Sequence, residues 1–304
     1  MRLRLWLCVL LALCVIATAA AEEEEASPYV ENNWDFVDGS MDVSGGIPGD
    51  VMGELARIRD AGVLRVATEP FFAPQEFIDP ALEGQAQYVG ADMELAKLIA
   101  QRMGVALEIV PMDFFDVLTA VAEGRCNLAI SALSYTPARA GMVELSKGYH
   151  FTEDNLGNSL LIRAEDAAEI TDVKSLADKN IVAQSGSLQE AIGANNIEAY
   201  HEFRRLASIQ AVYAALTSGK ADAAIVDIEN TLVYLENNPD CGLALVPGVT
   251  FTQEPQFQGD RIAGKKGELQ LMYFVNGVID EVLSDGRYEQ WFREYGEYAA
   301  RLGL

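Results

Sequence analysis

Apolar and polar positions alternate along the chain in blocks that predict an α/β fold. Short apolar runs typical of buried strands occur at 63–68, 105–112, 128–130, 158–163 and 181–184. Between these runs, apolar residues recur at helical spacing, as at Leu95, Leu98, Ile99 and Met103. Strands that alternate with helices favour mostly parallel sheets.

One helix–turn–strand pattern occurs twice, at residues 117–130 and 212–225. Gly124 and Gly219 hold the position at which each helix should end. The first copy leads into Ser131 and Ala132, and the second leads into Val226 and Asp227. We therefore expect one such unit in each half of the chain.

Polar residues predict where several other elements begin. Asp50, Asp92 and Ser208 precede helical patterns and are candidate N-caps. Further helices are predicted at 171–179, 229–237, 268–283 and 287–300. The stretch 251–266 is rich in Gln, Pro and Gly and is predicted to be irregular.

The first 49 residues are predicted to lie outside the fold. A basic start, an apolar run at 5–16 and small residues at 17–21 indicate a secretory signal peptide at residues 1–21. An uncleaved anchor is the alternative, and Cys14 leaves a lipoprotein site open. Residues 22–49 are acidic and are expected to form a tether or a loosely packed arm.

The charge and the cysteines exclude some classes of protein. The formal charge is −24, with 46 acidic and 22 basic residues, so we expect no nucleic-acid partner. Beyond the signal segment, Cys126 and Cys241 are the cysteines and His150 and His201 are the histidines. These residues lack the spacing of a Cys/His metal site, so we expect no metal or cofactor. A Cys126–Cys241 disulfide stays open.

The stretch from Ser131 to Arg139 carries the first candidate site. Hydroxyl side chains, a helix start at Pro137 and Arg139 together suit a small carboxylate, although a solvated turn is the alternative. Ligands of open α/β sheets bind beyond the carboxyl ends of strands. Other polar or aromatic segments at such ends are 69–72, 185–189 and Asp227, and the set complements a free α-amino acid.

The order and spacing of several short motifs point to one family. The motifs are Gly62–Thr68, Phe72–Pro74, Val89–Ala96, Ser131–Arg139, Gln184–Ser187, Gly219–Asp227 and Asp285–Tyr288. On these residues the chain resembles the extracellular amino-acid-binding proteins of ABC importers, family 3 of the bacterial solute-binding proteins. The resemblance runs from about Leu55 to Tyr295.

The resemblance implies a two-lobed α/β protein of the periplasmic-binding-protein type II fold. Two crossing strands would join lobe 1, residues 50–153 plus 260–304, to lobe 2, residues 154–259. A free amino acid, polar or basic, would be trapped between the lobes. The implied protein is a secreted monomer of the periplasm or cell surface that serves a membrane permease and catalyses no reaction.

The resemblance also implies roles for individual residues. Arg139 would bind the ligand carboxylate with help from Ser134 and from the segment Ser187, Leu188 and Gln189. Asp227 would bind the α-ammonium together with the Ala132 carbonyl and the Ser134 hydroxyl.

For the part of the implied site that would contact the ligand side chain, the residues have alternative roles. Phe72 and Phe115 would face one another across the ligand side chain, with core packing as the alternative. Glu69 would recognise a polar or basic side chain, or would instead pair with a neighbouring backbone amide. Gln75 departs from the family, which commonly has an apolar aromatic there.

Two other functions stay open on the same fold. A dehydratase of the cyclohexadienyl or arogenate type would use a cleft carboxyl, such as Glu69, as general acid. A sensory module would place the same lobes in a receptor, which we expect less because no membrane-spanning run or signalling domain follows in this sequence.

Overall fold

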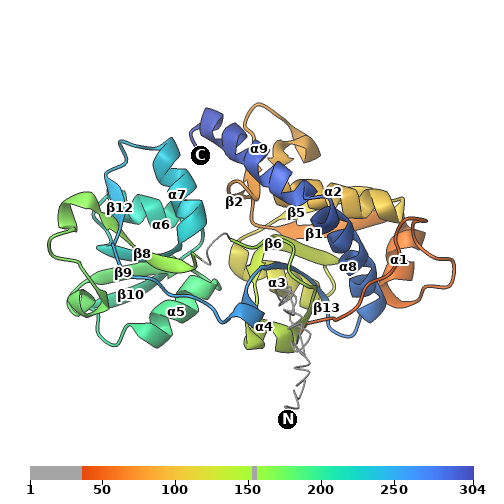
Figure 1. The fold of residues 1–304 in the computed structure, drawn as a ribbon, viewed down its shortest axis with the longest axis horizontal. Helices are drawn as coiled ribbons and strands as arrows, with labels where there is room; N and C mark the ends of the chain where they lie inside the picture. Colours follow the sequence, from red (N-terminus) through yellow and green to blue (C-terminus); the bar gives the residue numbers. More distant parts are fainter. Residues whose placement is uncertain (1–35, 153–155) are drawn as a thin grey trace, which may run out of the picture.

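The computed structural model describes residues 36–152 and 156–304, so the predicted signal peptide lies outside the described residues. The chain forms two lobes that lie side by side (Figure 1). Each lobe is a β-sheet covered by helices, which confirms the predicted α/β architecture.

Lobe 1 is built on a mixed sheet. Its strands, in spatial order, are β5 (Ala106–Pro111), β1 (Val63–Thr68), β6 (Leu128–Ser134), β13 (Asp260–Lys265) and β7 (Val143–Leu145). Its helices are α1 (Gly53–Ala61), α2 (Ala91–Met103), α3 (Phe114–Ala122), α4 (Pro137–Met142), α8 (Leu269–Ser284) and α9 (Arg287–Leu302). A small sheet of β2 (Phe71–Phe72), β3 (Glu76–Ile78) and β4 (Tyr88–Val89) lies at its edge.

Lobe 2 repeats this plan with fewer helices. Its strands, in spatial order, are β10 (Glu202–Leu206), β9 (Asn180–Gln184), β11 (Ala223–Asp227), β8 (Asn158–Arg163) and β12 (Leu243–Leu245). Its helices are α5 (Leu188–Asn196), α6 (Ile209–Thr217) and α7 (Ile228–Asn237). The predicted helix at 171–179 is only a short 3₁₀ turn, Val173–Leu176.

The expectation of mostly parallel sheets is wrong. In lobe 1, β1 is parallel to β5 and β6, but β13 is antiparallel to both β6 and β7. In lobe 2, β8 is antiparallel to both β11 and β12. The antiparallel partners β8 and β13 are the strands at which the chain enters lobe 2 and re-enters lobe 1. The predicted irregular stretch 251–266 therefore contains a strand, because β13 pairs on both sides with lobe 1.

The repeated helix–turn–strand unit is confirmed in both lobes. It forms α3–β6 in lobe 1 and α6–β11 in lobe 2. Gly124 and Gly219 follow the two helices with φ of 76° and 69°, the left-handed conformation that glycine adopts without strain. The units bring the carboxyl ends of β6 and β11 to the boundary between the lobes (Figure 1).

Two of the three predicted caps are wrong. Ser208 does cap α6, since its side chain accepts a hydrogen bond from the Ala211 amide. Helix α1 begins after Met52, not at Asp50. Helix α2 begins after Gly90, where a Cβ would lie 2.1 Å from the Gln75 carbonyl oxygen. This close approach requires glycine and moves the helix start ahead of Asp92.

The described part of the acidic arm is packed, not loose. Phe36, Val37 and Val43 are buried in lobe 1. Asn276 of α8 donates hydrogen bonds of 2.8 Å to the carbonyls of Val37 and Gly39. Residues 36–51 therefore lie along α8 as part of the lobe, and residues 22–35 lie outside the described residues.

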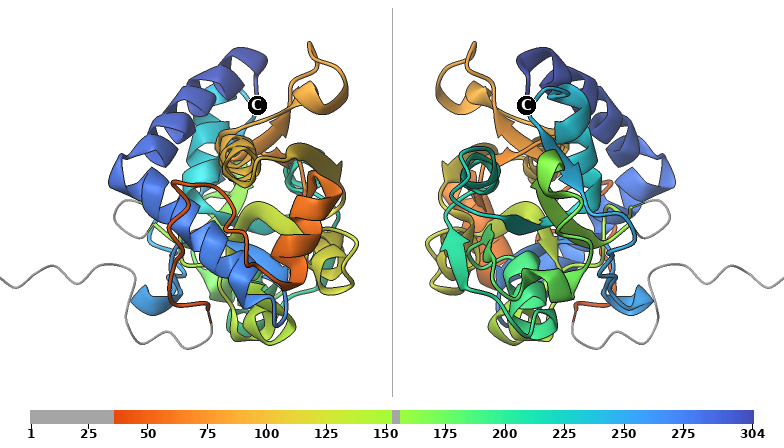
Figure 2. Two further views of the ribbon diagram at one scale, coloured as in Figure 1. Left: turned by 90° about the vertical axis from the view of Figure 1, so that its right-hand side faces the viewer. Right: turned by 90° about the vertical axis from the view of Figure 1, so that its left-hand side faces the viewer.

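The two lobes touch through polar contacts. Asn230 of α7 donates hydrogen bonds to the Ala73 carbonyl at 2.9 Å and to Oε1 of Gln75 at 2.7 Å. Helix α9 runs along lobe 1, and the carboxyl end of the chain reaches α7 of lobe 2 (Figures 1 and 2). The lobes are therefore in direct contact in this structure.

Candidate ligand-binding site

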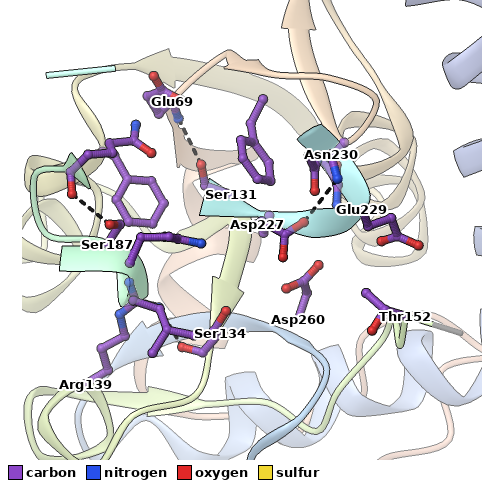
Figure 3. A pocket seen from close by; sticks show the side chains of 17 residues that line it. Glu69, Ser131, Ser134, Arg139, Thr152, Ser187, Asp227, Glu229, Asn230 and Asp260 are labelled. Atoms are coloured by element: carbon purple, nitrogen blue, oxygen red, sulfur yellow. Dashed lines mark hydrogen bonds between the residues drawn. The ribbon is translucent and has the colours of Figure 1, made fainter. Parts of the chain in front are cut away.

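A cavity lies between the lobes at the carboxyl ends of the central strands (Figure 3). It brings together most of the predicted site residues: Glu69, Phe72, Ala132, Ser134, Arg139, Ser187, Leu188, Gln189 and Asp227. It also contains residues that the sequence did not single out, namely Phe114, Thr152, Glu229, Asn230 and Asp260.

Arg139 is a buried cation without a carboxylate partner. The turn from β6 into α4 holds it, because the Thr136 side chain caps α4 by accepting from the Arg139 amide at 3.1 Å. The guanidinium donates to the carbonyls of Ser134 at 2.6 Å and of Gly186 in lobe 2 at 3.1 Å. Among the described residues, no carboxylate oxygen lies within 4.0 Å of it.

The electrostatics of Arg139 favour an anion in the cavity. Burial lowers the pKa of its guanidinium to about 10, and the charge of Asp260 opposes that shift only in part. The guanidinium also lies 5.5 Å from the centre of the Phe114 ring. A ligand carboxylate could accept the donors that now reach backbone carbonyls.

Lobe 2 offers a helix start beside the guanidinium. Ser187 is the N-cap of α5, with its hydroxyl accepting from the Glu190 amide at 3.1 Å. Leu188 and Gln189 are the first two residues of that helix. Amides in the first turn of a helix favour an anion. The arrangement is suited to a carboxylate held between the two lobes.

The backbone of β6 at Ala132 is strained, and hydrogen bonds hold it in place. Ala132 has φ of 45°, a conformation that costs a non-glycine residue free energy. Its amide donates to Asp92 at 3.0 Å, and the same carboxylate accepts from the hydroxyls of Tyr149 at 2.9 Å and Tyr288 at 2.6 Å. Asp92 therefore holds the backbone of the site, which explains why it is buried.

Carboxylates gather at the opposite side of the cavity. Asp227 caps α7 by accepting from the Asn230 amide at 3.1 Å, and its carboxylate lies near that of Asp260 (Figure 3). Burial raises the pKa of Asp227 to about 7 and that of Asp260 to about 7. A cationic group of a ligand would relieve this accumulation of negative charge.

His150 ties the lobes together beside these carboxylates. Its Nε2 lies 3.0 Å from Glu229 of α7, and its Nδ1 lies 2.9 Å from Glu289 of α9. Burial lowers the pKa of the imidazole, but the hydrogen bonds to both glutamates outweigh it and raise the pKa well above its ordinary value. The hydrogen bond with His150 engages the Glu229 carboxylate, whereas the carboxylates of Asp227 and Asp260 face the cavity.

Glu69 is a buried acid with no hydrogen-bond partner. It is 1% exposed, and neither oxygen of its carboxyl group is within hydrogen-bonding geometry of a donor. Burial raises the pKa of Glu69 to about 8, and the nearby Gln184 amide opposes the shift only in part. The Phe71 backbone amide also lowers the pKa of Glu69. The alternative of a pairing with a neighbouring backbone amide therefore stays open beside a role in receiving a ligand cation.

The structure places Phe115 outside the cavity. Phe115 is 62% exposed, whereas its neighbour Phe114 lines the cavity beside Arg139. Successive residues of a helix point about 100° apart, so only one of the pair can face the ligand. Because α3 begins at Phe114, the sequence could not show which of the two phenylalanines faces the cavity before the first residue of the helix was known.

Other features of the described residues bear on the remaining expectations. Cys126 and Cys241 are both free thiols. Within 36–152 and 156–304, no set of three or more His, Cys, Asp or Glu residues is arranged to hold a metal ion. In those same ranges no helix has both the length and the apolar character needed to cross a membrane.

Known proteins are similar to this chain in sequence. The sequence profile of the bacterial extracellular solute-binding proteins, family 3, matches residues 64–298. The arginine-binding extracellular protein ArtP of Bacillus subtilis is 27% identical over 209 residues, or 67% of this chain and 78% of ArtP.

Solved structures share the fold. The amino acid ABC transporter substrate-binding protein AbpA of Streptococcus pneumoniae, bound to L-arginine, is 32% identical with a TM-score of 0.71, covering 80% of this chain and 98% of AbpA. The ancestral amino-acid-binding protein AncCDT-1, a precursor of cyclohexadienyl dehydratase, covers 80% of this chain and 99% of its own, with 23% identity and a TM-score of 0.69. At that identity it shows the fold alone.

Proposed function

Because the chain belongs to the bacterial extracellular solute-binding proteins of family 3, we propose that it delivers a free basic amino acid to the membrane permease of an ABC importer. It would act outside the cytoplasmic membrane, as a monomer, after removal of the signal peptide. The relatives named above are arginine-binding or amino-acid-binding proteins, which supports this class of ligand.

The observation that carries the proposal is the distribution of charge around one cavity between the lobes. Arg139 and the start of α5 suit a carboxylate, Asp227 suits an α-ammonium, and Glu69 suits a cationic side chain. A basic amino acid carries these three charges on one molecule. A neutral or acidic side chain would leave Glu69 without a cation.

Closure of the lobes would be the binding event. Arg139 and Glu69 belong to lobe 1, whereas Asp227 and the start of α5 belong to lobe 2. One ligand can contact both sets only in the closed form. A ligand that binds the closed form better shifts the population toward it, and the permease would recognise that form.

A thermal-shift screen of the purified protein against the common amino acids and ornithine tests the proposal. Arginine, lysine or ornithine should raise the melting temperature at millimolar concentration, because a ligand that binds only the folded state stabilises it. Calorimetry of Asp227→Asn with the best ligand should show at least tenfold weaker binding. No shift with any basic amino acid would contradict the proposal.

One observation favours a second function, a dehydratase of the cyclohexadienyl or arogenate type. Glu69 has its pKa raised to about 8 and is therefore protonated at neutral pH, as a general acid must be. Incubation with prephenate or arogenate would distinguish the two functions. Consumption of either substrate that is lost in Glu69→Gln would favour the enzyme over the transport protein.

A further inference from the structure

Asp260 lines the ligand cavity because it begins β13, the strand with which the chain re-enters lobe 1. It is the first residue of β13, and its pairing with β6 places it directly opposite Ser134. Its amide donates to the His150 carbonyl at 2.9 Å, and its carbonyl accepts from the Tyr149 amide at 2.9 Å. The backbone of Asp260 is therefore fixed, and its side chain lines the cavity.

The carboxylate of Asp260 faces a second carboxylate across the cavity. Figure 3 shows the side chains of Asp227 and Asp260 directed toward one another from different lobes. No donor within the described residues makes a hydrogen bond to the Asp260 carboxylate, whereas Asp227 accepts only from the backbone at the start of α7. Among the described residues, no Lys, Arg or His side chain forms an ion pair with either carboxylate.

The charged groups around Asp260 do not supply such an ion pair. The His150 imidazole acts on the Asp260 carboxyl as a charge, but both of its ring nitrogens are engaged by Glu229 and Glu289. Asp92, behind Ala132, adds negative charge and accepts from two tyrosine hydroxyls. Arg139 acts on Asp260 only as a charge at a distance, without an ion pair in the described residues.

We infer that Asp260 is a second acceptor for the α-ammonium of the ligand, so that the ammonium is clamped between Asp227 of lobe 2 and Asp260 of lobe 1. This inference rests on the proposed function and specifies its α-amino end. An ammonium has three N–H donors, which the two carboxylates and Ser134 or the Ala132 carbonyl can accept. Without an ammonium, bringing the lobes together places two carboxylates near one another at a cost in free energy, so an α-amino group favours closure.

The consequence is strict discrimination at the α-position. A ligand that keeps its carboxylate and basic side chain but lacks the α-amino group should bind more weakly than the loss of one hydrogen bond would explain. The des-amino analogue of arginine, 5-guanidinopentanoate, is such a ligand. Replacing Asp260 by asparagine should remove part of that discrimination, because the amide neither attracts an ammonium nor repels Asp227.

The experiment measures the dissociation constants of arginine and of 5-guanidinopentanoate by calorimetry, for the wild-type protein and for Asp260→Asn. The ratio of the two constants should exceed about 100-fold in the wild type and should fall by at least about tenfold in the variant. Asp240→Asn makes the same chemical change at an exposed position and should leave the ratio unaltered.

The outcomes separate the two proposals. If Asp260→Asn weakens both ligands equally, or weakens neither, the ratio is unchanged and Asp260 does not bind the ammonium. A purely structural role would also leave the ratio unchanged, even if the melting temperature fell. A wild-type protein that binds no amino acid overturns the proposed function and this inference together.

Discussion

Replacing Glu69 by glutamine tests the side-chain end of the site. The substitution keeps the size of a buried group but removes the acid, whose two oxygens have no hydrogen-bond partner. We expect the variant to bind basic amino acids more weakly and to be more stable than the wild type when empty.

The loss of affinity can be estimated from the charges. Two unit charges about 4 Å apart attract by about 4 kcal/mol at an effective dielectric constant of about 20. At pH 7.5, removing the proton from a carboxyl of pKa about 8 costs less than about 1 kcal/mol. The net of about 3 kcal/mol corresponds to roughly 100-fold weaker binding of arginine by Glu69→Gln.

The gain in stability follows from the same pKa. A carboxyl whose pKa is raised from 4.5 to about 8 on folding holds its proton in the native state across that interval while the unfolded chain loses it. Wild-type stability therefore falls as pH rises from 4.5 to about 8, by up to about 5 kcal/mol from this group. The glutamine variant lacks this loss, so its advantage should grow across that window.

The assay combines calorimetry with arginine at several pH values and thermal melts of the empty protein. Wild-type binding should tighten as pH rises from 6 to 8, because the ligand cation expels the Glu69 proton, and this dependence should be weaker in Glu69→Gln. Glu83→Gln, an exposed position in the same lobe, is the matched control. Equal arginine affinity in Glu69→Gln and in the control would refute the reasoning.

Three further predictions concern other parts of the site. Arg139→Ala should weaken amino-acid binding by about 2–5 kcal/mol in calorimetry while the fold survives in circular dichroism, because it leaves the ligand carboxylate without its partner; unchanged affinity in a folded variant would remove Arg139 from the site. Phe114→Ala should weaken binding at least several-fold whereas Phe115→Ala should not, and the reverse result would show that α3 presents its other face. Folding raises the pKa of His150, so the stability that the charged imidazole contributes is complete below about pH 6.5 and is lost as the pH rises through the folded pKa. The difference in melting temperature between the wild type and His150→Gln should therefore shrink as the pH increases. A constant difference would argue against a charged imidazole.

The pattern of apolar and polar residues by itself determined many of the helices and strands and the division of the chain into two lobes. The segments 63–68 and 158–163 are strands with those bounds, because most of their positions are buried in the sheets and the buried positions are largely apolar. The repeated helix–Gly–strand unit placed Ala132 and Asp227 at equivalent strand ends, because local turn chemistry depends on glycine at fixed positions. Strand ends are where open sheets bind ligands, so Arg139 could be proposed without coordinates.

Only the tertiary structure decided which residues face the ligand. Phe114 replaced Phe115 because the first residue of α3, and hence the orientation of its side chains, depends on packing beyond the local pattern. Asp92 became an internal brace and not a cap because Gly90 must pass close to the Gln75 carbonyl. Asp260 entered the cavity because β13 pairs with β6 across a long separation in sequence, and such non-local pairing leaves no local signal.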